Sequence, residues 1–410
     1  MKNPPYFEIP REEYDSRLSK LRQTMAREQL DAMLFLCPEN IGYYSGYRRT
    51  WVATHQEYGL IVTQDGKEVL FVPWLNSQTI SKTSWVEDIR VWAGSKNMNQ
   101  PQDVVEVLLS IIKDLKLDRN KTIGAELAGG MYMNIAYHDF QALIEHFPDT
   151  RFVDASSLIW GQRRIKSPCE IEIMRRLGQI TTSGLEEGFK SASPGMTERE
   201  LGEIIWHKWI SEGAFDSPMQ GQGLMRSGRS SEGAMGRYNC VCTRPIDFPI
   251  ERNEGVFFDG GPSYKGYMSD IQRMLFLGDP PALLLDLVRT GEAGMRNAIQ
   301  VLKPGTKISE IYSAAVDGME AVMPGSHQKY PITFVGHCIG LNIHEPPWLV
   351  ENETSRLEEG MVICLEVGAY DTPGSRTIPG FPEDMFLITK DGHENLTSGL
   401  TRDLWVARKS

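Results

Sequence analysis

Carboxylates that could bind metal ions stand at the ends of apolar segments in the C-terminal part of the chain. Residues 255–258 lead directly into Asp259, and a turn-like stretch then leads to Asp270. A hairpin of this length brings the two aspartates side by side, where their charges repel unless a cation lies between them. Two solvated hairpin aspartates are the alternative interpretation of this pair taken alone.

Two further acids and two histidines extend the pattern. Residues 361–365 form another apolar segment, which ends in Glu366, and Glu383 opens a further one. A glycine-rich stretch between these hairpins carries His337 and His344. With the aspartate pair, the four carboxylates would be balanced by two divalent ions. Oxygen-rich ligation with one imidazole suits manganese, iron or cobalt better than a structural zinc, and a two-metal site can hold a hydroxide nucleophile.

Repeated elements position these residues. The acid-ended strand around Asp259 recurs around Glu366, and a helix–Pro-Gly–helix pattern at residues 194–195 recurs at 304–305. The two recurrences share nearly the same offset, which indicates one domain built from duplicated halves. Such halves would bring Asp259 and Glu366 to equivalent places beside a pseudo-twofold axis, so a single shared site is expected.

The N-terminal part of the chain predicts a separate, smaller domain. Residues 11–30 have helical spacing, 32–36 read as a buried strand, and 58–73 read as a hairpin. A length of 410 residues favours two cores over one. We therefore expect a two-domain α/β protein, with a small α/β domain over residues 1–158 and a duplicated α+β domain over 159–410.

Composition excludes several classes of function. The net charge of −11 gives no basic surface for nucleic acid, and no apolar stretch is long enough to cross a bilayer. The start of the chain has no apolar core of a signal peptide. Six cysteines are scattered without a CxxC pair, which is typical of reduced thiols and predicts a cytoplasmic protein.

Taken together, these motifs resemble the pita-bread metallohydrolase family, which includes aminopeptidase P, prolidase, methionine aminopeptidase and creatinase. The segments that match this family, in its order along the chain, are residues 40–47, 164–171, the pair Asp259 and Asp270, 336–347, Glu366 and Glu383. The resemblance implies a pita-bread catalytic domain behind a creatinase–prolidase type N-terminal domain. It also implies two divalent metal ions, with manganese as the first choice and iron, cobalt or zinc as alternatives, and a homodimer.

The resemblance also assigns roles to individual residues. The implied metal ligands are Asp259, Asp270, His337, Glu366 and Glu383. Asp270 and Glu383 would bridge the two ions. Glu366 would in addition help to deprotonate the attacking water, and His344 would contact the reacting group of the substrate.

Departures from the family concern the substrate. Thr333 stands where proline peptidases usually carry a further histidine, and Phe381 stands where prolidases usually carry an arginine for the substrate carboxylate. Arg376 lies near enough in sequence to substitute for that arginine. In this family an N-terminal loop of one subunit can reach the active site of its partner, and a solvated loop is the alternative interpretation. The candidate substrate contacts on that loop are Arg48, Arg49, Trp51 and His55.

We therefore expect metal-dependent hydrolysis of a C–N amide bond, with Xaa-Pro peptides as the leading substrates. The lost arginine and histidine predict weak cleavage of simple Xaa-Pro dipeptides. The alternative is a small-metabolite enzyme on the same fold, creatinase-like, ectoine-hydrolase-like or dimethylsulfoniopropionate-lyase-like. A non-catalytic binding module is less expected, because such relatives typically lose metal ligands, and all five are retained here.

Overall fold

The computed structural model describes residues 9–47, 57–93, 103–214, 224–229, 245–330, 332–368 and 382–407, with only the backbone of 224–229. The chain divides into two compact units, Met1–Arg163 and Arg164–Ser410. Both mix helices with strands, which confirms the predicted two-domain α/β fold. The sequence-based boundary after residue 158 falls inside helix α6 (Ser156–Arg164).

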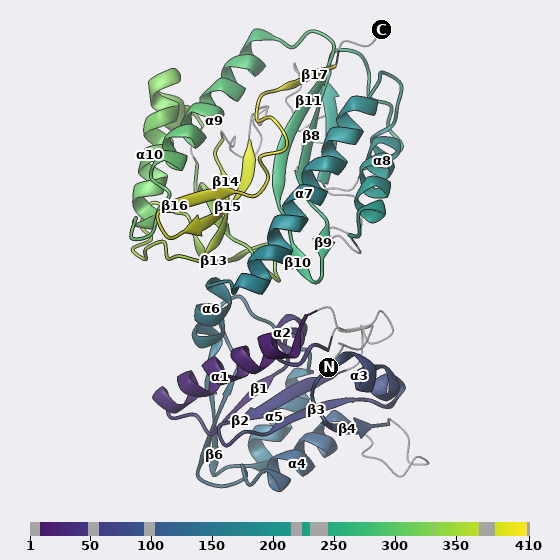
Figure 1. Cartoon of the computed structure of the whole chain (residues 1–410), viewed down its shortest axis with the longest axis vertical. Coiled ribbons are helices and arrows are strands. Elements are labelled where there is room, and N and C mark those ends of the chain that lie inside the picture. The colour runs from purple at the N-terminus through teal and green to yellow at the C-terminus, as the bar shows by residue number, and fades with distance from the viewer. Residues whose placement is uncertain are drawn as a thin grey trace. The chain divides into compact units, whose positions relative to one another are not determined.

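The N-terminal unit is built on one six-stranded sheet with the order β4-β3-β2-β1-β5-β6 (Figure 1). Its strands are β1 (Ala32–Phe35), β2 (Gly59–Thr63), β3 (Glu68–Pro73), β4 (Asp88–Trp92), β5 (Lys121–Ala125) and β6 (Thr150–Asp154). Its helices before α6 are α1 (Arg11–Arg27), α2 (Pro38–Ser45), α3 (Ser77–Thr83), α4 (Val104–Asp114) and α5 (Tyr137–His146), with a 3-10 turn η2 (Trp74–Asn76). The antiparallel pairing of β2 with β3 confirms the predicted hairpin.

Helix α4 shows how sequence pattern builds this unit. Asp103 accepts a hydrogen bond from the backbone N–H of Glu106 and so caps the first turn. Val107, Leu108 and Ile111 recur at helical spacing and are buried. They join side chains of the central strands and of α5 in one apolar cluster, so α4 and α5 cover one face of the sheet.

The C-terminal unit contains two larger sheets, ordered β17-β11-β8-β7 and β13-β12-β14-β15-β16, and a small pair β10-β9. The strands are β7 (Leu224–Arg229), β8 (Glu254–Gly260), β9 (Ser263–Tyr264), β10 (Tyr267–Met268), β11 (Ile271–Leu277), β12 (Gly336–Cys338), β13 (Glu345–Trp348), β14 (Val362–Glu366), β15 (Glu383–Thr389), β16 (Gly392–Asn395) and β17 (Trp405–Ala407). The helices are α7 (Pro168–Ser191), α8 (Glu198–Ser211), α9 (Ala282–Gln300), α10 (Ile308–Val322) and α11 (Ser326–Lys329).

The two halves of this unit repeat one arrangement, as the sequence predicted. Gly195 and Gly305 turn with φ of 90° and 89°, between α7 and α8 and between α9 and α10. After each turn an isolated antiparallel bridge forms, Thr197 with Pro249 and Lys307 with Arg356. Apolar side chains of α7 and α8 pack on β8 and β11, and those of α9 and α10 pack on β12, β14 and β15. The pita-bread architecture follows from this duplication.

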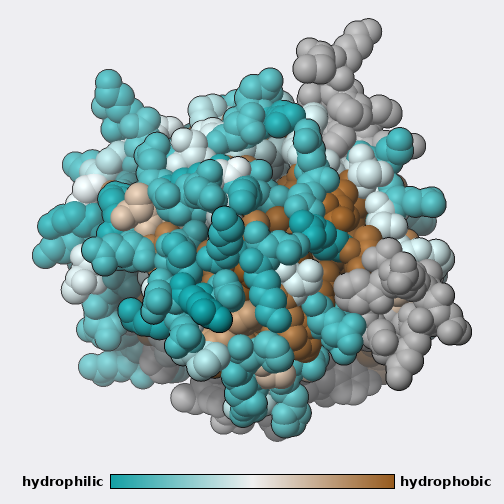
Figure 2. Space-filling view, turned by 90° about the horizontal axis from the view of Figure 1, so that it is seen from below, coloured by the Kyte–Doolittle hydropathy of each residue, from teal (hydrophilic) through white to brown (hydrophobic). Residues whose placement is uncertain are grey.

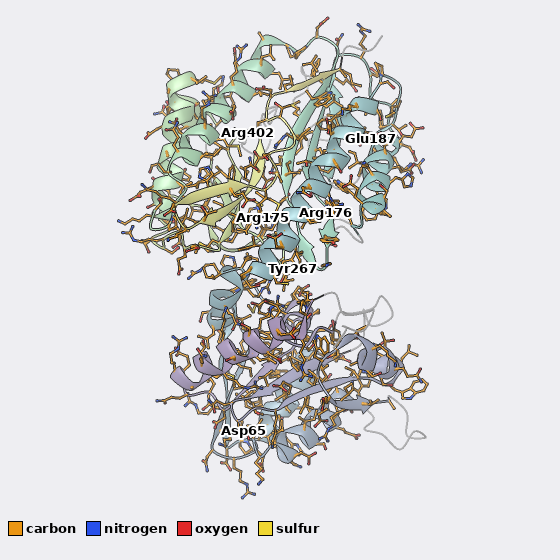
Figure 3. All side chains as sticks on the ribbon, viewed as in Figure 1. Asp65, Arg175, Arg176, Glu187, Tyr267 and Arg402 are labelled. Carbon is orange, nitrogen blue, oxygen red and sulfur yellow. The ribbon has the colours of Figure 1, made fainter. Side chains whose placement is uncertain are left out.

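Helix α7 opens the C-terminal unit with a capping box. Ser167 accepts from the backbone N–H of Glu170, whose carboxylate accepts from the Ser167 N–H in return. The other carboxylate oxygen of Glu170 accepts from the Tyr267 hydroxyl at 2.8 Å. Figure 3 shows Tyr267, the first residue of β10, beside the beginning of α7. The cap thereby ties α7 to the hairpin that follows Asp259.

Hydrophilic side chains cover most of the face shown in Figure 2, and apolar side chains appear between them. Folded proteins routinely expose apolar atoms in this way, so this face alone marks no partner site. Among the described residues, no helix combines the length and the hydropathy needed to cross a membrane.

Candidate metal centre

The first two candidate ligands lie at one end of the β8–β11 ladder. Asp259 is the penultimate residue of β8 and pairs with Gln272, while Asp270 directly precedes β11. The intervening hairpin, β9 with β10, returns the chain to this point. The register therefore brings the two aspartates together, as the hairpin length predicted.

The other three candidate ligands lie on neighbouring strands of the second sheet. His337 in β12 pairs with Cys364 in β14, and Glu366 in β14 pairs with Glu383 in β15. Because side chains alternate along a strand, His337, Cys364, Glu366 and Glu383 share one face. The opposite face carries Ile363 and its apolar neighbours, which pack against α9 and α10.

The two sheets bring these side chains to a common point. His337 Nε2 lies 3.8 Å from Asp270 Oδ2, 3.7 Å from Glu366 Oε1 and 3.8 Å from Glu383 Oε1. Ligand atoms of Asp259, Asp270 and Glu383 lie within 4.8 Å of one another. All five predicted ligands therefore converge, with Asp259 at the more open side and the others buried.

Without bound cations, burial and mutual repulsion disfavour the ionised form of the carboxylates in this cluster. Burial raises the pKa of Asp259 to about 7. Burial, with added repulsion from neighbouring carboxylates, raises the pKa of Asp270 and of Glu383 well above their usual ranges. Burial likewise lowers the pKa of His337 to about 3, so its imidazole is neutral at physiological pH. Two like charges at about 4 Å repel by roughly 4 kcal/mol at an effective dielectric of 20.

The unpaired polar atoms of the cluster fit divalent cations. In the described part of the chain, Asp270 Oδ1, His337 Nε2 and both Glu383 carboxylate oxygens have no hydrogen-bond partner. His337 Nδ1 lies 3.0 Å from the Cys338 carbonyl oxygen, so we assign the proton to Nδ1. The lone pair of Nε2 then faces the carboxylates, which is the usual state of a metal-binding histidine. The residues present therefore suit two oxygen-ligated divalent ions.

A second set of polar residues, which the sequence did not single out, holds the carboxylates in place. Gln272 Nε2 donates to Glu366 Oε2 at 2.9 Å. Arg273, buried within β11, donates to Asp384 Oδ1 at 2.6 Å and to the carbonyl oxygen of Glu383 at 2.6 Å. The adjacent Gln272 and Arg273 in the otherwise apolar strand β11 are the signal that could have identified this support.

Aromatic side chains flank the open side of the centre. The ring of His344, which is exposed, lies 4.5 Å from that of His337 and 5.1 Å from that of Trp348. Trp348 is 39 % exposed and also lies 5.3 Å from Phe334. The sequence interpretation missed Trp348, because its place beside His337 comes from the pairing of β12 with β13 rather than from a local pattern.

The predicted substrate contacts stay predictions, since only Thr333 lies among the described residues. Thr333 is described and is exposed. The other predicted contacts lie outside the described residues; they are Arg48, Arg49, Trp51, His55, Arg376 and Phe381. Cys338 is buried beside His337, and burial raises the pKa of its thiol to about 12, in line with a packing role. Cys364 is also buried, with its Sγ within 4.8 Å of ligand atoms of His337 and Glu383.

Known proteins share this architecture along nearly the whole chain. An Xaa-Pro dipeptidase from Lactobacillus helveticus is 27% identical over 93% of this chain and 96% of its own. The X-Pro aminopeptidase from Thermotoga maritima superposes with a TM-score of 0.78 at 22% identity, covering 95% of this chain and 99% of that one. A recombinant prolidase from Thermococcus sibiricus gives a TM-score of 0.81 at 20% identity, covering 96% and 99%.

Two family descriptions match consecutive parts of the chain. The Creatinase/Prolidase N-terminal domain matches residues 17–165, and Metallopeptidase family M24 matches residues 172–390. These matches confirm the resemblance inferred from the motifs and the prediction of a metal-dependent hydrolase, and they do not favour the small-metabolite or binding-module alternatives. With the converging carboxylates and imidazole now placed on two duplicated halves, the chain belongs to metallopeptidase family M24.

Proposed function

We propose that this protein is a two-metal peptidase that hydrolyses Xaa-Pro peptide bonds at the cluster of Asp259, Asp270, His337, Glu366 and Glu383. One observation carries the proposal: buried carboxylates and a neutral imidazole converge with several polar atoms that have no hydrogen-bond partner among the described residues. The proline preference is carried over from relatives named as Xaa-Pro dipeptidases. Two divalent ions held there would activate water and stabilise the charge that develops during hydrolysis.

The residues of the site then have distinct roles in the proposed reaction. Asp270 and Glu383, both buried, would be ligands of the ions, with one contributed by each half of the catalytic unit. Glu366 is oriented by Gln272 and is 7% exposed, so its Oε1 is placed to take a proton from the attacking water. His344 is exposed next to the cluster and donates a hydrogen bond to the carbonyl oxygen of the bond that breaks.

The substrate is proposed to meet an aromatic wall rather than an arginine. Trp348 offers a flat apolar face beside both imidazoles, which suits a proline ring or an apolar side chain. Phe381 cannot pair with a free substrate carboxylate. We therefore propose that longer Xaa-Pro peptides, which place no carboxylate there, are cleaved better than Xaa-Pro dipeptides.

The test is a kinetic comparison after metal loading. Purified protein is stripped with a chelator, reloaded separately with manganese, iron, cobalt or zinc, and its metal content is measured. We expect two ions per chain, highest activity with manganese, and a larger kcat/KM on Xaa-Pro tripeptides and longer peptides than on Xaa-Pro dipeptides. Failure to bind metal, or cleavage of amidines but of no peptide, would overturn the proposal. Dipeptides as the best substrates would overturn only the role given to Phe381.

The proposal also includes an oligomeric state and a cellular location. The family resemblance implies a homodimer, and light scattering tests the oligomeric state. Whether residues 47–55 contact substrate is tested separately, by the effect of Arg48→Ala and Arg49→Ala on KM. A cytoplasmic location is supported by free thiols at Cys37, Cys169, Cys338 and Cys364 in the described part of the chain. Fractionation of cells that produce the protein tests the location.

A further inference from the structure

A buried ion pair lies next to the loop that carries His344. Lys166 Nζ is 3.3 Å from Glu345 Oε2, and each side chain is only 1% exposed. Lys166 directly precedes the N-cap of α7, and Glu345 opens β13 immediately after His344. Buried charges are costly unless they are paired and hydrogen-bonded, so this pair fixes the local chain wherever it forms.

The Glu345 carboxylate also organises the main chain before His344. Its Oε1 accepts hydrogen bonds from the backbone N–H groups of Leu341 at 3.0 Å and Asn342 at 3.2 Å. A Cβ at Gly340 would lie 2.8 Å from both carboxylate oxygens, so a side chain there would displace the Glu345 carboxylate. The turn from residue 340 to 345 thus wraps around one carboxylate.

The main chain of Lys166 is itself anchored by a hydrogen bond. Its backbone N–H donates to the carbonyl oxygen of Gly360 at 2.8 Å, which ties it to the turn before β14. On the other side, Cys338 pairs with Glu345 across the β12–β13 ladder, where the register shifts beside His337. The ion pair therefore links the start of the catalytic unit to the segment that joins the two active-site histidines.

We propose that Lys166 and Glu345 are positioning residues that hold His344 in place beside the metal cluster. The inference rests on the proposed function, since it gives His344 its contact with the substrate. Lys166 orients the Glu345 carboxylate, and Glu345 holds the amides of Leu341 and Asn342. The imidazole of His344 is thereby presented at a fixed place. Neither residue touches the substrate.

The first experiment does not depend on any enzymatic activity of the protein. Amide hydrogen exchange is measured on the full-length, metal-free protein, on Lys166→Met, on Lys166→Met/Glu345→Gln and on a control, Arg164→Met. Arg164 pairs with Glu358 at 2.7 Å and is more exposed, so its replacement removes the same charge two residues away from Lys166 without breaking the contact with Glu345. We expect the amides of Leu341 and Asn342 to exchange about tenfold or more faster in Lys166→Met and unchanged in Arg164→Met.

The double variant separates charge from packing. It leaves no unpaired buried charge, and the glutamine oxygen still accepts from the two amides, so exchange should return to within about threefold of the wild-type rate. Equal exchange in wild type and Lys166→Met would overturn the proposal. Should Lys166→Met not fold, Glu345→Gln carries the test with the same expectation of faster exchange, because Lys166 then loses its counter-charge.

The second experiment shows whether the pair acts through His344. In metal-loaded protein, Lys166→Met should lower kcat about tenfold, with KM and metal content near wild type, and the double variant should recover most of this loss. In a His344→Ala background, Lys166→Met should have no further effect on kcat. An equal fold-loss in both backgrounds would overturn the positioning role. If the wild-type protein hydrolyses no peptide, the proposed function fails, while the exchange result still decides how the loop is held.

Discussion

At the scale of single residues, Asp270 is a buried carboxylate surrounded by other ligands of the proposed metal centre. It is buried, it lies 3.8 Å from His337 Nε2, and one carboxylate oxygen has no hydrogen-bond partner among the described residues. Asp270→Asn keeps the shape and removes the charge. We expect loss of both ions, measured by mass spectrometry, and more than a hundredfold loss of kcat/KM, because even outer supports of metal ligands contribute about 10–100-fold. Full metal occupancy in this variant would contradict the bridging role.

His344 should behave in the opposite way. It is exposed and stands at the edge of the cluster, with its ring 4.5 Å from that of His337. We expect His344→Ala to lower kcat by about 10²–10³-fold while both ions stay bound, since it removes a hydrogen bond made to the substrate. Metal analysis alongside kinetics checks this. Expulsion of the ions would show that His344 is a ligand instead.

Trp348 should affect substrate binding more than turnover. Its ring is 39 % exposed beside both imidazoles, and an aromatic contact contributes about 1 kcal/mol beyond area burial. We expect Trp348→Ala to raise KM for apolar Xaa-Pro peptides about fivefold with kcat nearly unchanged. Leu283→Ala is the control, because Leu283 is 53% exposed on α9 of the same unit and is not among the described residues that contact His337 or His344. An unchanged KM would remove Trp348 from the substrate pocket.

At the scale of elements, the close packing of β12 against β14 fixes the distance between the strands that carry His337 and Glu366. Gly336 has a φ of 144°, and a Cβ there would lie 2.0 Å from the Cys364 carbonyl oxygen. Gly336→Ala must therefore push apart the strands that carry His337 and Glu366.

We expect Gly336→Ala to destabilise the protein by more than about 3 kcal/mol and to lower metal affinity. Gly392→Ala is the matched control, because no atom lies within 4 Å of its Cβ position, and it should cost at most about 1 kcal/mol. Chemical denaturation measures both changes. Equal stability of the two variants would show that β12 and β14 can separate without loss.

At the scale of the whole molecule, metal binding should control stability in a pH-dependent way. Burial raises the pKa of Asp259 to about 7, and the pKa values of Asp270 and Glu383 are raised as well. A carboxyl group whose pKa is higher in the folded than in the unfolded state loses its stabilising contribution as pH rises through that interval. The metal-free protein should therefore become less stable as pH rises from about 4, the ordinary carboxyl range, to about 7 for Asp259, and beyond that through Asp270 and Glu383. His337, with its pKa lowered to about 3, stays neutral throughout this range.

Bound ions reverse this trend, since they require the ionised carboxylates and compete with protons. We expect the rise in Tm on adding manganese to be larger at pH 8 than at pH 6.5. Calorimetry of chelated and loaded protein at both values checks the difference. A rise in Tm that is independent of pH would mean that these carboxyl groups are already ionised without metal.

The sequence by itself determined the fold class, the duplication and the five candidate ligands. Strand alternation and apolar runs are local, so Asp259, Glu366 and Glu383 could be placed at strand ends without knowing which strands are neighbours. The Pro-Gly turns at Gly195 and Gly305 carried the repeat, because a residue with positive φ at the same place in both halves leaves a visible glycine. The resemblance to family motifs added the roles of His337 and His344 and the order of the ligands along the chain.

Only the tertiary structure decided which residues support the ligands. The contact of Lys166 with Glu345 and the contacts of Arg273 with Asp384 join positions far apart in sequence, and their energy depends on burial that no local pattern records. The same holds for Trp348, whose place beside His337 results from the β12–β13 register. Side-chain periodicity fixes the face on which a residue lies, but the pairing of strands fixes its neighbours, and neighbours determine charge, hydrogen bonding and access to substrate.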